Sequence, residues 1–433
     1  MWVYWMEIKR LDLARPIRQV LAITLMSICT FSLGFIIGKV LSETNTITIE
    51  PKSLTEAFNY IIWTDETIVY AKNGRTGQID FSGINAATVI QSAINALPEA
   101  EGCILIKSGY YNINTTINLR SHITLMGEGR DTRLIHRVEG APCIKIAGTK
   151  ENPKYDILLL DFTIEGTPAS GDGIYLEYCV NIWIVRLYIV LCGVGNGLHA
   201  KNSSFSSITL CSIEENGLNG IRLTSCEEWR ITNNGIKSNC WHGIWLDGSH
   251  MNTITANHIS RNIKNGIYMT WATSNIIAEN HIFWNDAGIT KSWDGIDLLS
   301  SSSNMIMGNY LLTNRGRAID ISDKNCSRNY IINNFITGEH IMPQIRNIGE
   351  ENIIKGNMGF KTENSGTAII PAGLTSITIP HGLPKTPKIV IATSRANIGA
   401  IWIPHRNETH ITISCSTTPT EDVIIDWYAE LGG

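Results

Sequence analysis

The sequence has little charge and no cysteine motif for a metal. Charged residues make up 17% of the 433 residues, and the formal net charge is −4. So small an imbalance gives no support for nucleic acid or an acidic substrate as a partner. The ten cysteines are irregularly spaced and include no Cys-x-x-Cys pair, so a zinc site has no support. We expect most of them to be small buried residues, and the sequence does not reveal any disulfide pairing.

Long apolar runs are also scarce, and residues 20–38 form one without a charged side chain. As a helix, this run would be roughly 29 Å long, about the thickness of a bilayer core. Four basic residues between Lys9 and Arg18 precede it, which predicts a cytoplasmic amino terminus. We therefore expect a cytoplasmic segment at 1–19, a single-pass anchor in the cell membrane at 20–38, and an extracytoplasmic body. A cleaved signal peptide is the alternative, and it would also export the body.

A phrase of four residues returns seven times along the middle of the chain. Its copies start 24, 23, 23, 23, 29 and 23 residues apart. In order they are Gly173-Ile-Tyr-Leu, Gly197-Leu-His-Ala, Gly220-Ile-Arg-Leu, Gly243-Ile-Trp-Leu, Gly266-Ile-Tyr-Met, Gly295-Ile-Asp-Leu and Ala318-Ile-Asp-Ile. A degraded eighth copy starts at Gln344, and an Asn-x-Ile-x-x-Asn phrase keeps pace from Asn252 to Asn357. Self-similarity at a fixed period indicates a repeat architecture.

Each copy alternates β-branched residues with others and is interrupted by Gly and Asn, which indicates short strands with one buried face. We expect Asn and Gly to adopt the left-handed conformation at the bends. A repeat of this length suits one coil of three short strands that pair in parallel with the next coil. Ile and Leu would then form buried columns, and Asn would stack into ladders. A leucine-rich horseshoe is the weaker alternative, because its Leu-x-x-Leu-x-Leu frame is missing.

The segments before the repeat follow other patterns. Residues 85–97 have one apolar face and Asn85 as an N-cap, which predicts a helix that covers the open end of the coil. Residues 39–69 are predicted to be a stalk or lead-in. Within them, Ser53 to Glu56 fits a helix capping box before residues 57–62.

After the repeat, the period stops. Short alternating runs separated by Pro and Gly then predict a small antiparallel β-sandwich at 363–433. The sequence thus predicts an all-β chain with a parallel β-helix at 70–362.

Several segments resemble the opening of pectate-lyase-superfamily proteins, which include tailspike-like and polysaccharide-degrading proteins. They are Asn85 to Ile94, Gly102 to Ile106, Gly109 to Ile113 and Ile123 to Gly129. The later repeats resemble the right-handed parallel β-helix repeats of the same superfamily. The resemblance covers roughly Tyr70 to Phe360 and implies the fold. It says little about chemistry, because that fold hosts lyases, hydrolases, epimerases, adhesins and structural spikes.

In each phrase the residue between the two apolar ones faces outward, so these residues should stack into one external column. The column reads Tyr175, His199, Arg222, Trp245, Tyr268, Asp297, Asp320 and, from the degraded copy, Arg346. Aromatic rings beside charged groups suit a saccharide-binding surface. The predicted glycan-binding residues are Tyr175, His199, Trp245, Tyr268, Trp271, Trp293, Asp247 and Arg346. The alternative is an ordinary sheet face of cross-strand pairs.

The acids of the column give the sharper signal. Asp297 and Asp320 should lie about 4.8 Å apart on adjacent strands. Two carboxylates that close share a proton, bind a cation such as Ca²⁺, or divide acid and nucleophile roles. We predict both as catalytic residues and, in the second case, as Ca²⁺ ligands.

Two family resemblances bear on this chemistry. Trp293 to Asp297 is similar to the Asn-Thr-Asp-Gly segment of polygalacturonase-type hydrolases, which implies that Asp294 is the catalytic acid. That family has two adjacent acids one coil later, where this chain has Arg317-Ala318, and its Gly-His-Gly and Arg-Ile-Lys elements are missing. Pectate lyases of this fold use Ca²⁺ and an Arg base, a role that the resemblance would give to Arg222 or Arg346.

The sequence therefore predicts a membrane-anchored extracellular β-helix that recognises a polysaccharide. Lyase or glycoside hydrolase activity in a groove on the outer sheet is the enzymatic option. The alternative is a non-catalytic adhesin or structural surface spike, homo-oligomeric through its lead-in or sandwich. A complete group of acids and Arg would favour an enzyme, whereas aromatic rings alone would favour a binder.

Overall fold

The computed structural model describes residues 57–288, 292–341 and 343–431. The chain forms two compact units that divide between Ile213 and Glu214. The anchor predicted at 20–38 lies outside the described residues. Within the described ranges, no helix has the length and apolar character needed to cross a membrane.

The described part of the N-terminal unit opens with an antiparallel meander, whose first strand replaces the helix predicted at 57–62. Its strands are β1 (Tyr60–Thr64), β2 (Val69–Asn73) and β3 (Ile79–Gly83). Tyr60 and Ile62 are buried while their neighbours are less so, which is the alternation of a strand with one packed face. The capping box itself, Ser53 to Glu56, lies outside the described residues, and part of the lead-in predicted at 39–69 is folded sheet.

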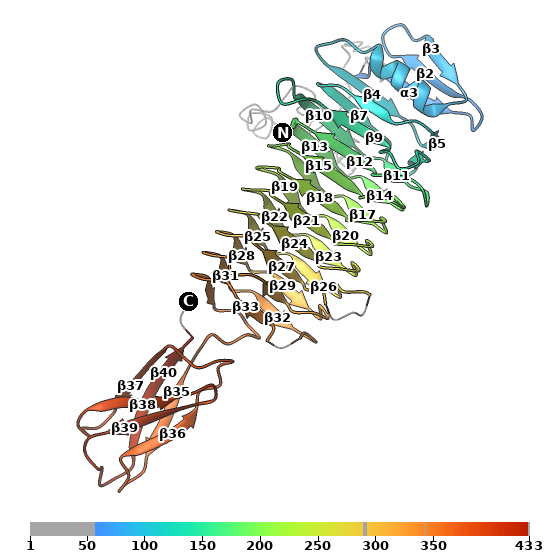
Figure 1. The fold of residues 1–433 in the computed structure, drawn as a ribbon. Coiled ribbons are helices and arrows are strands. Elements are labelled where there is room, and N and C mark those ends of the chain that lie inside the picture. Colours follow the sequence, from blue (N-terminus) through green and yellow to red (C-terminus); the bar gives the residue numbers. More distant parts are fainter. Residues whose placement is uncertain (1–56, 289–291, 342, 432–433) are drawn as a thin grey trace, which may run out of the picture. The chain divides into compact units, whose positions relative to one another are not determined.

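An amphipathic helix lies where the sequence predicts it. It is α3 (Ala86–Asn95), and the side chain of Asn85 accepts a hydrogen bond from the Thr88 backbone N–H at its first turn. It packs against β2, β3, β5 (Gly109–Ile113) and β6 (Ile117–Leu119). Figure 1 shows it beside β2 and β3.

Three parallel sheets follow in the N-terminal unit, with one strand of each sheet in every coil. Sheet A contains β4 (Gly102–Ile106), β7 (Ile123–Met126), β10 (Lys154–Leu160), β13 (Cys179–Val185) and β16 (Ser207–Thr209). Sheet B contains β5 (Gly109–Ile113), β8 (Thr132–His136), β11 (Thr163–Glu165) and β14 (Tyr188–Val190). Sheet C contains β6 (Ile117–Leu119), β9 (Ile144–Ala147), β12 (Ile174–Glu177) and β15 (Leu198–Lys201). β17 (Ser212–Glu214) lies at the division between the units.

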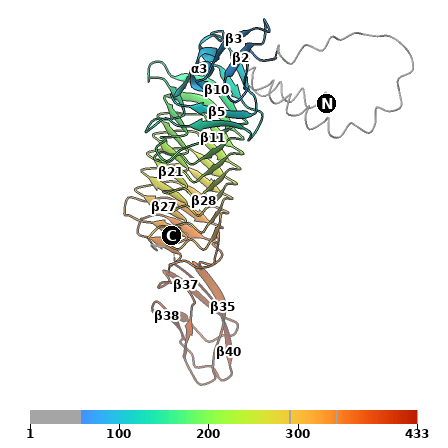
Figure 2. The same cartoon turned by 90° about the vertical axis from the view of Figure 1, so that its right-hand side faces the viewer.

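The C-terminal unit continues with the same three-strand coil, whose stacked strands include β21, β27 and β28 in Figure 2. Its sheet A strands are β19 (Arg230–Thr232), β22 (Thr253–Thr255), β25 (Ile276–Ala278), β28 (Met305–Met307), β31 (Tyr330–Ile332) and β34 (Ile353–Lys355). Its sheet B strands are β20 (Gly235–Lys237), β23 (His258–Ser260), β26 (His281–Phe283), β29 (Tyr310–Leu312) and β32 (Phe335–Thr337). Its sheet C strands are β18 (Ile221–Thr224), β21 (Ile244–Asp247), β24 (Ile267–Thr270), β27 (Ile296–Leu299), β30 (Ile319–Ile321) and β33 (Ile345–Asn347).

The predicted register of sheet C is confirmed. Ile244 pairs with Ile267, Ile267 with Ile296, and Ile296 with Ile319. All four side chains are fully buried. Inward Ile and Leu columns of this kind supply most of the burial that holds a coil against its neighbours.

Asparagine ladders run through the C-terminal unit, as predicted. In one of them the Asn275 Nδ2 donates to Asn304 Oδ1 at 3.0 Å, and Asn304 Nδ2 donates to Asn329 Oδ1 at 3.0 Å. The bends agree with the prediction in some coils, for example at Gly308 (φ 63°) and Asn333 (φ 53°), and differ from it in others. The left-handed conformation falls on the residue before a ladder Asn, for example Met251 (φ 55°) and Arg261 (φ 56°). That residue turns the chain, and the next side chain then points inward and bonds along the ladder.

The last strands form a separate antiparallel layer pair. One sheet has the order β35 (Glu363–Ile370), β40 (Val423–Glu430), β37 (Ile389–Ser394), and the other has the order β36 (Ser376–Pro380), β39 (His410–Cys415), β38 (Ile401–Arg406). Buried residues such as Ile370, Ile411 and Ile425 fill the space between them. Throughout the part of the chain that the structure describes, no cysteine forms a disulfide.

Candidate functional site

The outward column of the C-terminal unit has the predicted register. Arg222 pairs with Trp245, and Trp245 with Tyr268. The next partners along sheet C are Asp297, Asp320 and Arg346. In the N-terminal unit, Tyr175 pairs with His199, and their rings meet edge to face with centroids 5.4 Å apart.

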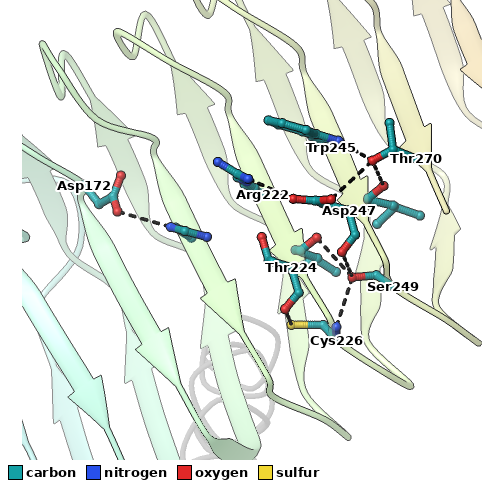
Figure 3. A network of polar contacts seen from close by, with 11 residues as sticks. Asp172, Arg222, Thr224, Cys226, Trp245, Asp247, Ser249 and Thr270 are labelled. Carbon is teal, nitrogen blue, oxygen red and sulfur yellow. Dashed lines mark hydrogen bonds and ion pairs between the residues drawn. The ribbon is translucent and has the colours of Figure 1, made fainter. Parts of the chain in front are cut away.

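At the Arg222 end of the column, the side chains bind one another. Arg222 Nη2 donates to Asp247 Oδ2 at 2.8 Å, and its guanidinium lies 4.1 Å from the Trp245 ring centroid. Trp245 Nε1 donates to Thr270 Oγ1 at 3.0 Å, which in turn lies 3.3 Å from Asp247 Oδ1 (Figure 3). Arg222 is thus held as a charged ion-pair partner, which does not suit a catalytic base.

The other end of the column gathers acids. One carboxylate oxygen from each of Asp294, Asp297 and Asp320 lies within 4.8 Å of the others. Asp320 is 3% exposed, and both its oxygens accept from Arg346, one of them from Nε at 2.6 Å. Asp297 Oδ2 accepts from Asn265 Nδ2 at 3.2 Å. Its Oδ1 is buried, and no described residue hydrogen-bonds to it.

Burial and mutual repulsion change the acidity of two members of this cluster. The pKa of Asp294 is raised to about 8, chiefly by burial; a backbone hydrogen bond from Arg317 opposes the rise, and the charges of Asp297 and Asp320 add to it. The pKa of Asp297 is raised to about 7, chiefly by burial and also by the charge of Asp320. The pair therefore holds at least one proton near neutral pH.

A second column, one residue before the glycine of each phrase, supplies Asp294. It contains Asn219, His242, Asn265, Asp294 and Arg317. Each backbone N–H donates to the side chain one coil earlier: His242 to Asn219 Oδ1, Asn265 to His242 Nδ1, Asp294 to Asn265 Oδ1 and Arg317 to Asp294 Oδ1. We call this the mixed ladder. Burial lowers the pKa of His242 to about 3, which keeps Nδ1 free to accept.

Aromatic rings surround His242 and rim the acid cluster. The His242 ring stacks on Tyr268 with centroids 4.6 Å apart and meets Trp293 edge-on at 5.9 Å. Lys264 Nζ lies 3.6 Å from the Trp241 ring centroid and 4.7 Å from that of Trp293. Trp271, at the opposite end of β24, is 62% exposed. These rings offer flat apolar surfaces beside titratable groups, as saccharide sites do.

The acid cluster has the spacing of a cation site, but its donors are largely taken. Ca²⁺ needs six to eight oxygen ligands. Arg346 occupies both oxygens of Asp320, and the Arg317 N–H occupies Asp294 Oδ1. A proton held within the cluster therefore fits this arrangement better than a Ca²⁺ ion between Asp297 and Asp320. Ca²⁺ binding stays a prediction.

Comparisons with known proteins agree on the architecture. A family model described as periplasmic copper-binding protein (NosD) matches residues 160–320. The chain has the right-handed parallel β-helix fold. A search of curated proteins finds no match.

Solved structures at low sequence identity share this fold. The Dettilon tailspike protein is 17% identical with a TM-score of 0.50, over 79% of this chain and 90% of that one. ORF18 of Geobacillus virus E2 is 14% identical with a TM-score of 0.60, over 78% and 72%. DFA-IIIase from Arthrobacter chlorophenolicus A6, in complex with GF2, is 15% identical with a TM-score of 0.53, over 64% and 84%. At such identities the likeness is one of fold.

Asn265 and Lys264 are two site residues that the sequence reasoning missed. Both belong to the 23-residue period, just before the glycine of the phrase at Gly266. The repeat was read only from that glycine onward, where inward and outward residues alternate as in a strand. The residue just before each phrase has the same period, and its change from Asn to His, Asp and Arg is the sequence signal of the mixed ladder.

Proposed function

We propose that the C-terminal unit binds a glycan along the outward column and hydrolyses a glycosidic bond at the acid cluster. One observation carries this proposal: Asp294 and Asp297 are neighbouring acids whose raised pKa values leave one proton between them near neutral pH. Glycoside hydrolysis requires such a pair, with one carboxyl protonated and one ionised.

In this reaction Asp294 gives its proton to the leaving glycosidic oxygen as the carbon–oxygen bond breaks. Asp297, as carboxylate, either takes a proton from the water that attacks the sugar carbon or attacks that carbon itself. Water supplies the new hydroxyl group, and its second proton restores the acid. Asp320, whose two oxygens accept from Arg346, lies beside them, and its charge adds to the raised pKa of both neighbours.

The lyase option has less support. It needs an arginine that accepts a proton from the sugar, yet Arg222 is paired with Asp247 and Arg346 with Asp320. Both guanidinium groups are thus already bound in ion pairs, and arginine is not deprotonated in proteins.

The matched family's name includes copper, but the acid cluster is a poor copper site. Copper prefers imidazole, thiolate and thioether ligands, whereas carboxylates suit Mg²⁺ and Ca²⁺. His242 is the imidazole beside the cluster, and its Nδ1 already accepts the Asn265 N–H.

We place the body outside the cytoplasm, held by an anchor at 20–38, with α3 covering the end of the coil. The matched family's periplasmic description and the uncharged run support this location. The tailspike likeness keeps a non-catalytic, homo-oligomeric spike as the alternative.

The test uses purified full-length protein, its Asp297→Asn variant and a panel of neutral and acidic polysaccharides, with Ca²⁺ or a chelator. New reducing ends and unsaturated products are measured separately, together with glycan binding. We expect new reducing ends without unsaturated products and without a need for Ca²⁺. Asp297→Asn should lose this activity but still bind, and Asp426→Asn in the sandwich should match the parent.

Other outcomes identify the alternatives. Unsaturated products that require Ca²⁺ would establish a lyase instead. Binding without any cleavage would support the adhesin or spike. Full activity in Asp297→Asn would remove the acid pair from the mechanism.

A further inference from the structure

Asn265 is a fully buried residue at the centre of the proposed active site. It makes three hydrogen bonds, each with a different residue. Its backbone N–H donates to His242 Nδ1 at 3.3 Å, its Oδ1 accepts from the Asp294 backbone N–H at 2.5 Å, and its Nδ2 donates to Asp297 Oδ2 at 3.2 Å. One amide side chain thus contacts both acids of the pair.

The contrast with Asn262, three residues earlier, shows that this arrangement is not a general property of the fold. Asn262 Nδ2 donates to Asn285 Oδ1 at 3.0 Å and to the Ile236 carbonyl at 3.3 Å, so its amide serves only the stacking of coils. Asn265 keeps the acceptor role of a ladder residue, but its donor is directed at a carboxylate.

The ladder also distinguishes the two oxygens of Asp294. Oδ1 accepts the Arg317 backbone N–H, while the Asp294 N–H is held by Asn265. A backbone N–H cannot give up its proton, so a proton on this carboxyl belongs on Oδ2. The orientation of the donor oxygen then depends on the ladder on both sides of Asp294.

We propose that Asn265 is a positioning residue, which holds Asp294 through its backbone and Asp297 through its carboxylate so that the proton lies on Asp294 Oδ2. This inference rests on the proposed glycoside hydrolysis for its role in turnover. The arrangement of the two carboxyl groups can be tested without any substrate.

The test compares Asn265→Ala and Asn265→Asp with the matched control Asn262→Ala. Asn265→Asp keeps an oxygen for the Asp294 N–H but replaces the amide donor to Asp297 by a further acid, so it tests the same contact if Asn265→Ala does not fold. Both Asn265 variants should reduce kcat about a hundredfold, with little change in KM, because misplacement of reacting groups has effects of this size. Losing a hydrogen bond to the Asp297 carboxylate should also move the acidic limb of the pH profile upward by about one pH unit.

Asn262→Ala should destabilise the protein to a similar degree but leave the pH profile where it is in the parent. The same three variants and the parent are titrated by carbon NMR of labelled Asp carboxyl groups, without substrate. We expect the midpoint of Asp297 to rise in the Asn265 variants and to stay unchanged in Asn262→Ala.

The outcomes separate this inference from the proposed function. If the Asp297 midpoint shifts but the parent cleaves no glycan, the proposed function fails and the positioning role stands. An unchanged midpoint and pH profile in Asn265→Asp, or an equal shift in Asn262→Ala, would overturn the positioning role.

Discussion

Two ladders of the C-terminal unit contain similar hydrogen bonds but differ in what each side chain must do. In the ladder of Asn252, Asn275, Asn304, Asn329 and Asn352, each side chain accepts from the coil before it and donates to the coil after it. Asn275 also donates to the Ser249 carbonyl at 3.0 Å. In the mixed ladder, each side chain only accepts one hydrogen bond, from the backbone N–H of the residue one coil later.

The difference explains where this fold can hold reactive groups. A position that must donate and accept along the stack suits the amide of Asn. A position that need only accept also tolerates a neutral His or an Asp, whose remaining atoms are then available to a ligand. The mixed ladder introduces His242 and Asp294 in this way without losing the link between coils.

The largest expected effect comes from making the mixed ladder more uniform. Asp294→Asn keeps an acceptor for the Arg317 N–H but removes the proton that the acid donates. We expect about a 10²–10⁴-fold loss in glycan hydrolysis, the usual contribution of a general acid, with an unchanged circular dichroism spectrum. Hydrolysis at the parent rate would remove Asp294 from catalysis.

Breaking the uniform ladder should affect stability instead. Asn304→Ala deletes a buried amide that receives the Asn275 N–H at 2.9 Å and donates to the Ala272 carbonyl at 2.9 Å. Leaving buried partners unsatisfied should lower the free energy of unfolding by roughly 2–4 kcal/mol. A denaturant titration measures this change. A variant as stable as the parent would show that the ladder contributes little.

The two ladders should also differ in their dependence on pH. The pKa of Asp294 is about 8 in the folded protein, above its unfolded value, so folding is favoured by protonation. This contribution is complete below about pH 4 and is lost as the pH rises through 8. Relative to the parent, Asp294→Asn should therefore gain about 1–3 kcal/mol of stability between acidic and alkaline pH.

Thermal melts at several pH values check this expectation, with Asn304→Ala as the comparison. The Asn304→Ala difference from the parent should be independent of pH, because no charge is changed. A pH-independent difference for Asp294→Asn would mean that its carboxyl group is not perturbed by burial.

The smallest effect is expected at His242. His242→Asn restores the residue found at Asn219 and Asn265 and can still accept the Asn265 N–H. It loses the ring contact with Tyr268, and such contacts contribute about 0.5–1.5 kcal/mol. We expect a change in kcat/KM of about tenfold or less, measured by initial rates. A loss as large as that of Asp294→Asn would give His242 a direct chemical role.

Much of the fold could be predicted from the repeat. Because the period is fixed and buried residues alternate with exposed ones, only one parallel register pairs Ile244 with Ile267 and Ile267 with Ile296. The pairing of Asp297 with Asp320 followed from the same register. The strand at Tyr60–Thr64 could not be predicted from its local pattern, since its partners β2 and β4 lie elsewhere in the sequence. Tertiary pairing of this kind overrides local helix propensity.

The sequence by itself determined the coil, its register and the stacking of outward residues, because each depends on a period that the chain carries along its length. Only the tertiary structure decided which acids act together and in which state. Asp294 belongs to a different column from Asp297 and Asp320 but lies close to both. Arg346 forms an ion pair with Asp320, and Arg222 forms one with Asp247. A pKa depends on burial and on charges from neighbouring coils, and these are set by distances in space that no spacing along the chain contains.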